Sequence, residues 1–436
     1  KFEEKNSGLM QKVLIITYYW PPAGGPGVQR WLKFVKYLRD FDIEPIVYAP
    51  ENPNYPLTDE SFLQEIPQGI KVYKQKIFEP YGLAGAFSRK KTKQISAGII
   101  ASRNQSVLER MLLWVRGNLF IPDARVFWVG PSVKFLSKLI AEEGINTIIT
   151  TGPPHSIHLI GQRLKRISPV NWIADFRDPW TSIGYHKKLR LTSWAQEKHR
   201  RLERSVLNDA DKIIVTSATT KEEFSRSTTK PIAIITNGYD SMDEKPMDLD
   251  DNFTVSHIGS LLSGRNPISF WKALSELIRE DRDFRRYFRL RLAGVVSNEV
   301  MESIHLHGLW PYTEVLGYLS HDDALLYQKK SQVLLLIEID SHETSGIIPG
   351  KVFEYMAAGR PILGVGPQNW EVADLVKASH TGKIYTYQQF DEFKLTLLQW
   401  FQEYRNGQLT LPSAQIAPYH RRELTGELAK QIKQWE

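Results

Sequence analysis

Residues 345–361 read Ser345-Gly-Ile-Ile-Pro-Gly-Lys-Val-Phe-Glu-Tyr-Met-Ala-Ala-Gly-Arg-Pro361. The Pro-Gly pair at 349–350 breaks the preceding chain, and Gly359 is the kind of residue that follows a last helical turn. We therefore predict a short helix over 350–358. The apolar residues that follow the stretch predict a buried strand. A helix that runs directly into such a strand indicates an α/β fold.

Two charged residues share one face of this predicted helix. Lys351 and Glu354 are separated by one helical turn. The free N–H groups of a helix N-terminus, together with a lysine, favour a phosphate group. A carboxylate one turn later can accept hydrogen bonds from a sugar diol. The pair therefore suits a nucleoside diphosphate, although a solvated surface ion pair is the commoner interpretation of this spacing.

The stretch resembles the C-terminal signature of family 4 glycosyltransferases, which are retaining, nucleotide-sugar-using enzymes with the GT-B fold. The resemblance implies that Glu354 holds the nucleotide ribose, as the second carboxylate of a Glu-x7-Glu pair. The first carboxylate of that pair would fall at Gly346, where this chain departs from the pattern. Glu338 and Glu343 precede it but are out of register, so we do not transfer the role to either.

The resemblance covers residues 10–436. It implies two Rossmann-like, doubly wound domains that face each other across a cleft, with the C-terminal helix crossing back to the N-terminal domain. The alternation of apolar strands and amphipathic helices indicates the same α/β class. We assign residues 10–240 to an N-terminal acceptor-side domain and 241–252, which are acidic and contain proline, to a linker. Residues 253–415 would bind the nucleotide sugar, and 416–436 would form the returning helix.

Composition limits the alternatives. At 436 residues the chain is long enough for two domains. It contains no cysteine, which excludes disulfides and thiolate metal sites and fits a cytoplasmic location. No apolar run reaches the roughly 18 residues of a membrane span, and no signal peptide is visible. The net charge of +7 permits anionic ligands, but no nucleic-acid recognition motif is visible, so we expect no nucleic-acid partner.

A glycine-rich loop at residues 20–27 follows the first predicted strand. Gly24 and Gly25 would let backbone N–H groups approach a ligand at the carboxyl end of that strand, although a tight turn is an equal interpretation. The resemblance favours the ligand, because this family lines its cleft with a Gly-Gly loop. His155 follows a later strand. The resemblance implies that it lies over the donor sugar, whereas a surface or capping histidine is the ordinary alternative.

Three charged residues follow the next predicted strand, namely Asp175, Arg177 and Asp178. In open α/β sheets, ligands bind outside the carboxyl ends of the strands. These side chains and His155 should therefore point into one cleft. We predict that the three line the acceptor side of it.

The donor diphosphate needs positive charge. Arg265 leaves a glycine-bearing loop just before a predicted helix, and the resemblance places an arginine here on the diphosphate. The lysine that the family usually carries a few residues later is absent, so Lys351 is our candidate for the second charge. Ser320 lies in a loop, residues 317–321, that resembles the one bordering the nucleobase. We count Ser320 and Gly346 among the residues that bind the donor.

A possible membrane contact lies in the first half of the chain. Residues 88–93 are basic, and residues 107–120 form an amphipathic segment that contains Trp114. A basic loop beside such a helix can lie on an anionic membrane. A charged loop beside a core helix is the simpler interpretation. The resemblance adds weight to the membrane, because many family members act on lipid-linked acceptors.

These features and the resemblance predict a retaining glycosyltransferase that moves a sugar from a nucleotide-diphosphate sugar to a glycan or lipid-linked acceptor in cell-surface polysaccharide synthesis. Arg265 and Lys351 would stabilise the leaving diphosphate, and His155 would touch the sugar. We expect no cofactor and no metal. Two alternatives stay open: an isomerase like the nucleotide-sugar 2-epimerases, and a non-catalytic nucleotide-sugar-binding protein, which Gly346 favours. We expect a cytoplasmic protein with a peripheral contact at the inner membrane face.

Overall fold

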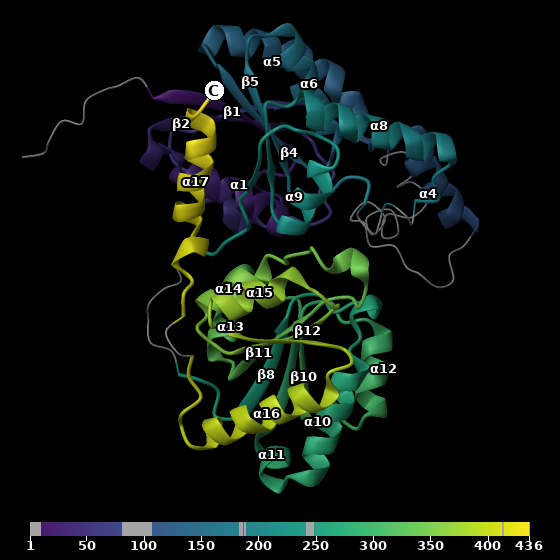
Figure 1. Ribbon diagram of the computed structural model, residues 1–436, viewed down its shortest axis with the longest axis vertical. Coiled ribbons are helices and arrows are strands. Elements are labelled where there is room, and N and C mark those ends of the chain that lie inside the picture. The colour runs from purple at the N-terminus through teal and green to yellow at the C-terminus, as the bar shows by residue number, and fades with distance from the viewer. Residues whose placement is uncertain are drawn as a thin grey trace, which may run out of the picture. The chain divides into compact units, whose positions relative to one another are not determined.

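The computed structural model describes residues 10–80, 107–182, 186, 189–240, 248–411 and 414–435. The chain forms two compact units. Unit 1 comprises the described residues up to Thr236 together with those from Arg421 onward, and unit 2 comprises Asn237–His420. Each unit contains one parallel sheet flanked by helices (Figure 1). The predicted α/β class with two doubly wound sheets is therefore confirmed.

Among the described residues, unit 1 holds a seven-stranded parallel sheet in the order β3-β2-β1-β4-β5-β6-β7. Its inner strands are buried almost throughout, as expected where helices cover both faces of a parallel sheet. The strands are β1 (Gln11–Thr17), β2 (Ile43–Pro50), β3 (Lys71–Gln75), β4 (Thr147–Gly152), β5 (Asn171–Phe176), β6 (Lys212–Val215) and β7 (Ile232–Ile234). The helices are α1 (Pro26–Tyr37), α4 (Val107–Leu119), α5 (Val129–Glu143), α6 (Ser156–Ile167), α8 (Ser193–Asp209), α9 (Ala218–Ser225) and α17 (Arg421–Lys433).

The last helix belongs to unit 1 although it follows unit 2 in the chain. α17 packs against α1. Gln11 of β1 donates a hydrogen bond to the carbonyl of Ile432, and Arg422 pairs with Asp40 at 2.8 Å. The return of the C-terminal helix to the first domain, which the resemblance implies, is thus observed. Within the ranges given above, no helix is both long and apolar enough to cross a membrane.

The part of unit 2 that the structure describes holds a six-stranded parallel sheet in the order β10-β9-β8-β11-β12-β13. The strands are β8 (Phe253–Ile258), β9 (Phe288–Ala293), β10 (Thr313–Gly317), β11 (Val333–Ile337), β12 (Ile362–Gly366) and β13 (Gly382–Thr386). The helices are α10 (Ile268–Glu280), α11 (Arg282–Tyr287), α12 (Asn298–Leu306), α13 (His321–Lys330), α14 (Lys351–Ala357), α15 (Glu371–Ala378) and α16 (Phe390–Arg405).

Side chains of β11 supply both layers of the core of unit 2, because successive residues of a strand point to opposite faces. Leu335 packs with residues of α10 and α16, whereas Leu334 and Leu336 pack with residues of α14 and α15. Figure 1 shows the same division of the helices between the two faces of the sheet. The sheet is therefore held rigidly from both sides, with its loops free to carry function.

Each sheet has one point at which the strand order reverses. It lies between β1 and β4 in unit 1, and between β8 and β11 in unit 2. In open α/β sheets, the loops on the two sides of such a point diverge, and ligands bind in the crevice between them, beyond the carboxyl ends of the strands. The Gly-Gly loop and His155 follow the first pair of strands, and Arg265 follows β8 in the second. The topology therefore brings these predicted site residues to the two crevices.

Close packing between α6 and its sheet depends on a glycine. A Cβ atom at Gly161 would lie 2.4 Å from Nε1 of the buried Trp172 and 2.7 Å from Cγ2 of Thr150. We predict that Gly161→Ala destabilises unit 1 by about 1–3 kcal/mol, despite the higher helix propensity of alanine. Gly130→Ala in α5 is the control, because no atom lies within 4 Å of its Cβ position. The midpoints of urea unfolding should fall for the first variant only. Equal midpoints would contradict the packing described here.

Candidate functional site

Arg265 lies beside the crevice of unit 2, where a buried carboxylate holds it in place. Its Nε and Nη2 atoms each donate a hydrogen bond of 3.0 Å to Glu338, the residue that follows β11. The Glu338 side chain is 1% exposed, and the Arg265 side chain is 31% exposed. Because this two-point contact uses one edge of the planar guanidinium, the remaining N–H groups form a second donor edge with a fixed orientation.

Lys351, at the start of α14, brings a second cation to the same crevice. Its Nζ atom lies 3.3 Å from Nε2 of His257 on β8. Burial and the nearby Arg265 lower the pKa of Lys351 to about 8, against the opposing effect of Glu338 and Glu354. A lysine with this pKa is still mainly charged at pH 7. The structure thus brings Arg265 and Lys351 together, as the diphosphate prediction requires.

Glu354 lies one helical turn after Lys351, and its side chain is partly exposed. Gln328 of α13 donates a hydrogen bond of 3.2 Å to Oε2 of Glu354. The second oxygen is therefore able to accept from a ligand. The predicted helix over 350–358 is observed as α14, Lys351–Ala357, with only seven residues. So short a helix makes a weak phosphate site by itself, and the case for one rests on the two cations.

Two further residues predicted to bind the donor lie in loops of unit 2. Gly346 is in the turn between a 3₁₀ helix, His342–Thr344, and α14. Ser320 is exposed and caps α13, since its hydroxyl accepts from the Asp323 backbone N–H at 3.1 Å and donates to the Asp323 carboxylate. Neither contacts the Arg265–Glu338 pair through an observed hydrogen bond, so their assignment to the donor site stays a prediction.

The predicted Gly-Gly loop of unit 1 leads from β1 into α1. Gly25 has a φ of +87° and precedes α1. The backbone N–H of Gly24 donates to the carbonyl of Leu57 at 2.9 Å, and a Cβ at Gly24 would lie 2.8 Å from the Leu57 side chain. The glycines are thus explained in part by loop closure. Both remain partly exposed at the crevice.

Asp175, predicted to face the acceptor, is instead part of the core of unit 1. Its side chain is 0% exposed and pairs with Arg30 of α1 at 3.0 Å. It also accepts hydrogen bonds of 2.8 Å from the indole of Trp31 and the hydroxyl of Thr151. Arg30 in turn donates to the carbonyls of Ile235 and Thr236. Asp175 therefore connects α1, β4 and β5, and its geometry is that of a structural residue.

Arg177 and Asp178 lie at the end of β5 and are partly exposed. Arg177 donates to the carbonyls of Gly152 and Pro153 and lies over the Tyr19 ring, 5.5 Å from its centroid. Burial lowers the pKa of Arg177 and raises that of Asp178. No described residue hydrogen-bonds or ion-pairs with the Asp178 carboxylate. Of the three predicted acceptor residues, Asp178 is therefore the one best placed to receive a ligand.

His155 precedes α6 at the crevice of unit 1, but its side chain is 4% exposed. The imidazole stacks on Trp180, with ring centroids 4.9 Å apart and an angle of 2° between planes. Neither ring nitrogen has a hydrogen-bond partner in the described part of the chain, and burial keeps its pKa well below the ordinary value. The ring is packed in this conformation rather than presented to a sugar, so the predicted sugar contact would require it to leave the stack.

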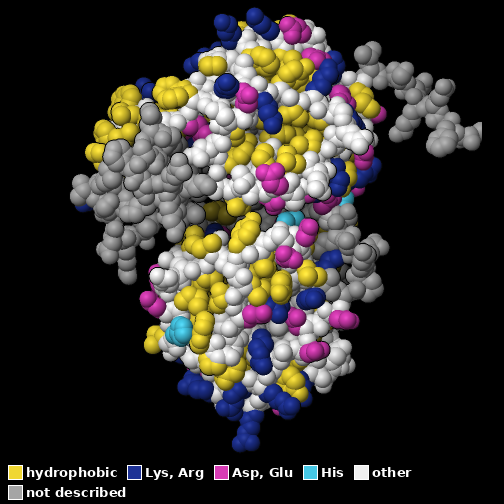
Figure 2. All heavy atoms as spheres, turned by 180° about the vertical axis from the view of Figure 1, so that it is seen from behind, with side chains coloured by type: hydrophobic (Ala, Val, Ile, Leu, Met, Phe, Trp, Pro, Cys, Tyr) yellow, Lys and Arg dark blue, Asp and Glu magenta, His cyan; other side chains and the backbone are white. Residues whose placement is uncertain are grey.

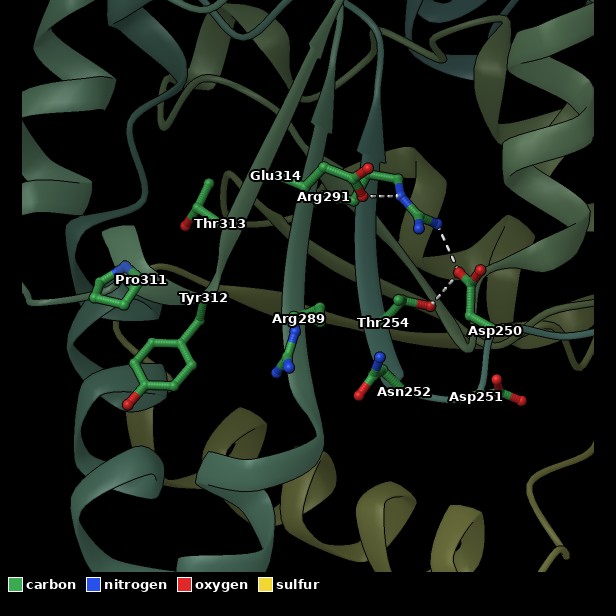
Figure 3. A pocket seen from close by; sticks show the side chains of 10 residues that line it. All are labelled: Asp250, Asp251, Asn252, Thr254, Arg289, Arg291, Pro311, Tyr312, Thr313 and Glu314. Atoms are coloured by element: carbon green, nitrogen blue, oxygen red, sulfur yellow. Dashed lines mark hydrogen bonds and ion pairs between the residues drawn. The ribbon is translucent and has the colours of Figure 1, made fainter.

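A pocket of about 490 Å³ lies at the opposite end of the sheet of unit 2, near the amino ends of β8, β9 and β10. Figure 3 shows Arg291 between Asp250 and Glu314, with Arg289 on the same strand. The Arg291 guanidinium lies 2.6 Å from Asp250 and 2.7 Å from Glu314. These charges neutralise one another, and none of the predicted site residues lines the pocket. We therefore locate the candidate site at the carboxyl ends of the strands.

No group of three His, Cys, Asp or Glu side chains is arranged to hold a metal ion within the described ranges. His257 is a residue of the site that sequence reasoning missed, whereas Glu338 was named from the sequence but assigned no role. Glu338 follows a strand, so the rule that drew attention to Asp175 would also have found it. His257 offers no comparable signal, because a histidine inside an apolar strand is indistinguishable from a core residue until its neighbours are known.

Comparison with known proteins gave structural matches alone. No family model matches the chain, and neither does any curated protein sequence. HepE from Anabaena, solved with UDP, is 14% identical, with a TM-score of 0.59 over 97% of this chain and 99% of that one. WaaG, a glycosyltransferase involved in lipopolysaccharide biosynthesis, is 12% identical, with a TM-score of 0.55 over 97% and 100%.

A third similar structure represents the alternative chemistry. A protein described as a UDP-N-acetylglucosamine 2-epimerase from Listeria monocytogenes is 13% identical, with a TM-score of 0.54 over 97% of this chain and 95% of that one. At such identities the likeness concerns the fold, and it confirms the predicted two-domain GT-B architecture. The chemistry has to be argued from the side chains of this chain.

The buried Arg30–Asp175 pair gives a direct test of the structural role of Asp175. We predict that Asp175→Asn costs about 3–5 kcal/mol of stability, because it leaves the Arg30 charge buried without a counter-charge. Asp178→Asn, three residues later and at a partly exposed position, should change stability by less than about 1 kcal/mol. Urea unfolding followed by circular dichroism measures both. A similar loss in the two variants would refute the distinction between them.

Proposed function

We propose that this chain is a metal-independent, retaining glycosyltransferase that uses a nucleotide-diphosphate sugar. The observation that carries the proposal is the convergence of Arg265 and Lys351 at the strand-order reversal of unit 2, with Glu354 one helical turn further on. Two cations match a diphosphate, and a carboxylate matches the ribose hydroxyls. The two cations followed by the carboxylate match the order of the diphosphate and the ribose in a nucleoside diphosphate.

The cations would also contribute to catalysis. As the bond between the sugar and the diphosphate breaks, negative charge builds up on the leaving group, and cations already aimed at it lower the barrier. Glu338 keeps Arg265 oriented through its two hydrogen bonds, so little reorganisation would be needed during the reaction. Since Arg265 and Lys351 supply the charge, the proposed reaction needs no metal ion.

The sugar-transfer step itself rests on the resemblance. Gly346 stands where the family has its first carboxylate, and no carboxylate pair with the spacing used by glycosidases was identified in the sequence. Front-side attack by the acceptor, the mechanism usually proposed for this family, is the route we propose. Asp178 is our candidate to contact the acceptor hydroxyl. A cell-surface glycan or lipid-linked oligosaccharide is the acceptor class we propose.

Two other functions are separable by experiment. An epimerase of this architecture would convert a nucleotide sugar to its epimer without any acceptor, whereas a glycosyltransferase would release nucleoside diphosphate. A non-catalytic protein would bind the nucleotide and turn over no donor with any acceptor. Chromatography of UDP-sugars after incubation, with and without a panel of glycan acceptors, distinguishes the three outcomes.

We also propose that unit 1 contacts an anionic membrane surface. Met111, Trp114 and Leu119 on α4 are 56%, 42% and 64% exposed. Asn118 of α4 accepts a hydrogen bond from the backbone N–H of Thr192, the residue before α8, and Trp194 of α8 is 64% exposed. Hydrophobic side chains gather at the upper left of Figure 2, where this end of unit 1 is seen. The predicted basic run at 88–93 lies outside the described residues.

The donor site makes a quantitative prediction. Melting with excess UDP, GDP, ADP, dTDP or CMP should reveal one nucleoside diphosphate that stabilises the protein, by about 2.7 kcal/mol at 100 times its Kd. Lys351→Met and Glu354→Ala should each weaken that ligand at least about tenfold, because each removes a hydrogen bond to a charged group. Lys377→Met, at an exposed position of α15, is the matched control. If the Glu354→Ala variant binds the nucleotide with wild-type affinity, Glu354 does not hold the ribose.

The membrane contact makes a separate prediction. Wild-type protein should sediment with vesicles of phosphatidylglycerol and phosphatidylcholine and much less with phosphatidylcholine alone. The double variant Met111→Ser/Leu119→Ser should lose most of that binding, since it removes exposed apolar area from α4. Leu306→Ser, at an 83% exposed position in unit 2, controls for general hydrophobicity. Equal sedimentation of all three proteins would rule out α4 as the contact.

A further inference from the structure

The amino group of Lys351 sits in a closely defined position. It lies 3.3 Å from Nε2 of His257. It also lies directly over Gly259, where a Cβ atom would come within 2.6 Å of Nζ. Gly259 has a φ of +131°, a conformation that side-chain-bearing residues rarely adopt. A side chain at position 259 would therefore collide with the Lys351 side chain.

The protonation state of His257 follows from its second contact. Nδ1 of this histidine is 2.9 Å from the carbonyl oxygen of Leu335 on the neighbouring strand β11. A carbonyl oxygen can only accept, so Nδ1 carries the proton. Burial and the nearby Lys351 keep the pKa of His257 well below the ordinary value, so the ring is neutral. Nε2 is therefore a lone-pair acceptor, and it points at the ammonium group of Lys351.

The other buried histidines of the chain lack this arrangement. His155 and His158 each have at least one ring nitrogen without a partner in the described part of the chain. Nδ1 of His257 faces the carbonyl of Leu335 and Nε2 faces Lys351, and the backbone of Ser260 also interacts with the ring. A leucine at this buried strand position would pack as well as the histidine does. Packing alone therefore does not explain the directed contacts of the ring.

We propose that His257 is a positioning residue for Lys351: the neutral ring, fixed by β11, holds the ammonium group over Gly259 where it meets a ligand phosphate. This inference rests on the function proposed above and deepens it. Lys351 would otherwise be a flexible side chain with several rotatable bonds, and restraining it beforehand reduces the entropy lost on binding. His257 itself would make no contact with the ligand.

The arrangement makes diphosphate binding depend on pH. The charged groups that face Lys351 are Arg265, which disfavours its charge, and Glu338 and Glu354, which favour it; burial is the largest effect, and the resulting pKa is about 8. The ammonium form binds an anion better than the neutral amine does. Affinity should therefore be highest at and below about pH 7 and fall as the pH rises through about 8. A phosphate group loses its second proton near about pH 6, so the ligand charge is constant in this range.

Two substitutions separate the contacts of His257. Asn carries an amide N–H near the position of Nδ1 and so keeps the donation to Leu335, but it is too short to reach Lys351. Gln is long enough to offer its carbonyl oxygen to Lys351. If His257 acts through the lysine, His257→Asn should bind the nucleoside diphosphate more weakly than wild type. His257→Gln should recover part of that affinity. Urea unfolding of each variant checks that the unit is folded.

The experiment measures Kd by calorimetry between pH 7 and 9.5, using the tightest binder among UDP, GDP, ADP and dTDP. We expect His257→Asn to weaken binding about tenfold at pH 7, which corresponds to the loss of one hydrogen bond to a charged group. We also expect the pH midpoint to move below that of wild type, because an acceptor that stabilised the ammonium form is gone. His257→Gln should recover part of both effects, and Lys351→Met should abolish the pH dependence.

A second readout needs no ligand. The rate at which acetic anhydride labels Lys351, followed by peptide mass spectrometry against pH, reports the proton affinity of this lysine directly. The labelling midpoint should be lower in His257→Asn than in wild type, and Lys377 should label identically in both proteins. This control lysine is exposed on α15.

The outcomes separate the two levels of the proposal. If wild type binds a diphosphate but His257→Asn matches it in Kd and in both pH midpoints, the positioning role is overturned while the donor site stands. If wild type binds none of the four ligands, the proposed donor site is wrong, and so is the part of this inference that concerns diphosphate binding. The labelling midpoints then still decide whether His257 controls the charge of Lys351.

Discussion

A buried carboxylate has to be compensated, and in unit 2 this requirement organises the site. Glu338 is 1% exposed at the end of a central strand, where an uncompensated charge would be costly. Arg265 compensates it through a two-point contact and so acquires a fixed orientation at the point where the strand order reverses. The Lys351 ammonium group lies 3.3 Å from Nε2 of His257, in the space left by the absent side chain of Gly259. The positive crevice is thus a consequence of how the sheet stabilises its own strand ends.

Unit 1 also compensates a buried carboxylate with an arginine, but there the arginine is buried as well. There the buried carboxylate is Asp175, and its partner Arg30 is itself almost fully buried, at 1% exposure. The pair connects α1 to the sheet, so the Arg30 charge is used inside the core. The partly exposed polar groups at this end of the sheet include the Gly-Gly loop, Arg177 and Asp178, and Arg177 is already bonded to the carbonyls of Gly152 and Pro153. This contrast supports the proposal that unit 2 binds the charged nucleotide and that unit 1 binds a hydroxyl-bearing acceptor.

The sequence predicts the architecture well because local signals determine it. Glycine and proline place α14 at Lys351–Ala357, within the predicted 350–358, and continuous apolar runs place the inner strands. It predicts the use of individual side chains less well. Asp175 and Arg177 satisfy the strand-end rule but bond to Arg30 and to the carbonyls of Gly152 and Pro153. Contacts between residues so far apart in the sequence cannot be predicted from local sequence patterns. The contact between His257 and Lys351 is of the same kind.

Hydrogen-exchange mass spectrometry with and without a saturating nucleoside diphosphate tests the central claim most directly, because it locates a bound ligand without assuming any residue. The account predicts slower exchange in peptides covering 259–266 and 338–355, the segments that carry Arg265, Glu338 and Lys351, and unchanged exchange in peptides covering 250–254, which line the pocket at the amino ends of the strands. Protection confined to 250–254, or to unit 1, would contradict a donor site at the carboxyl ends of β8 and β11.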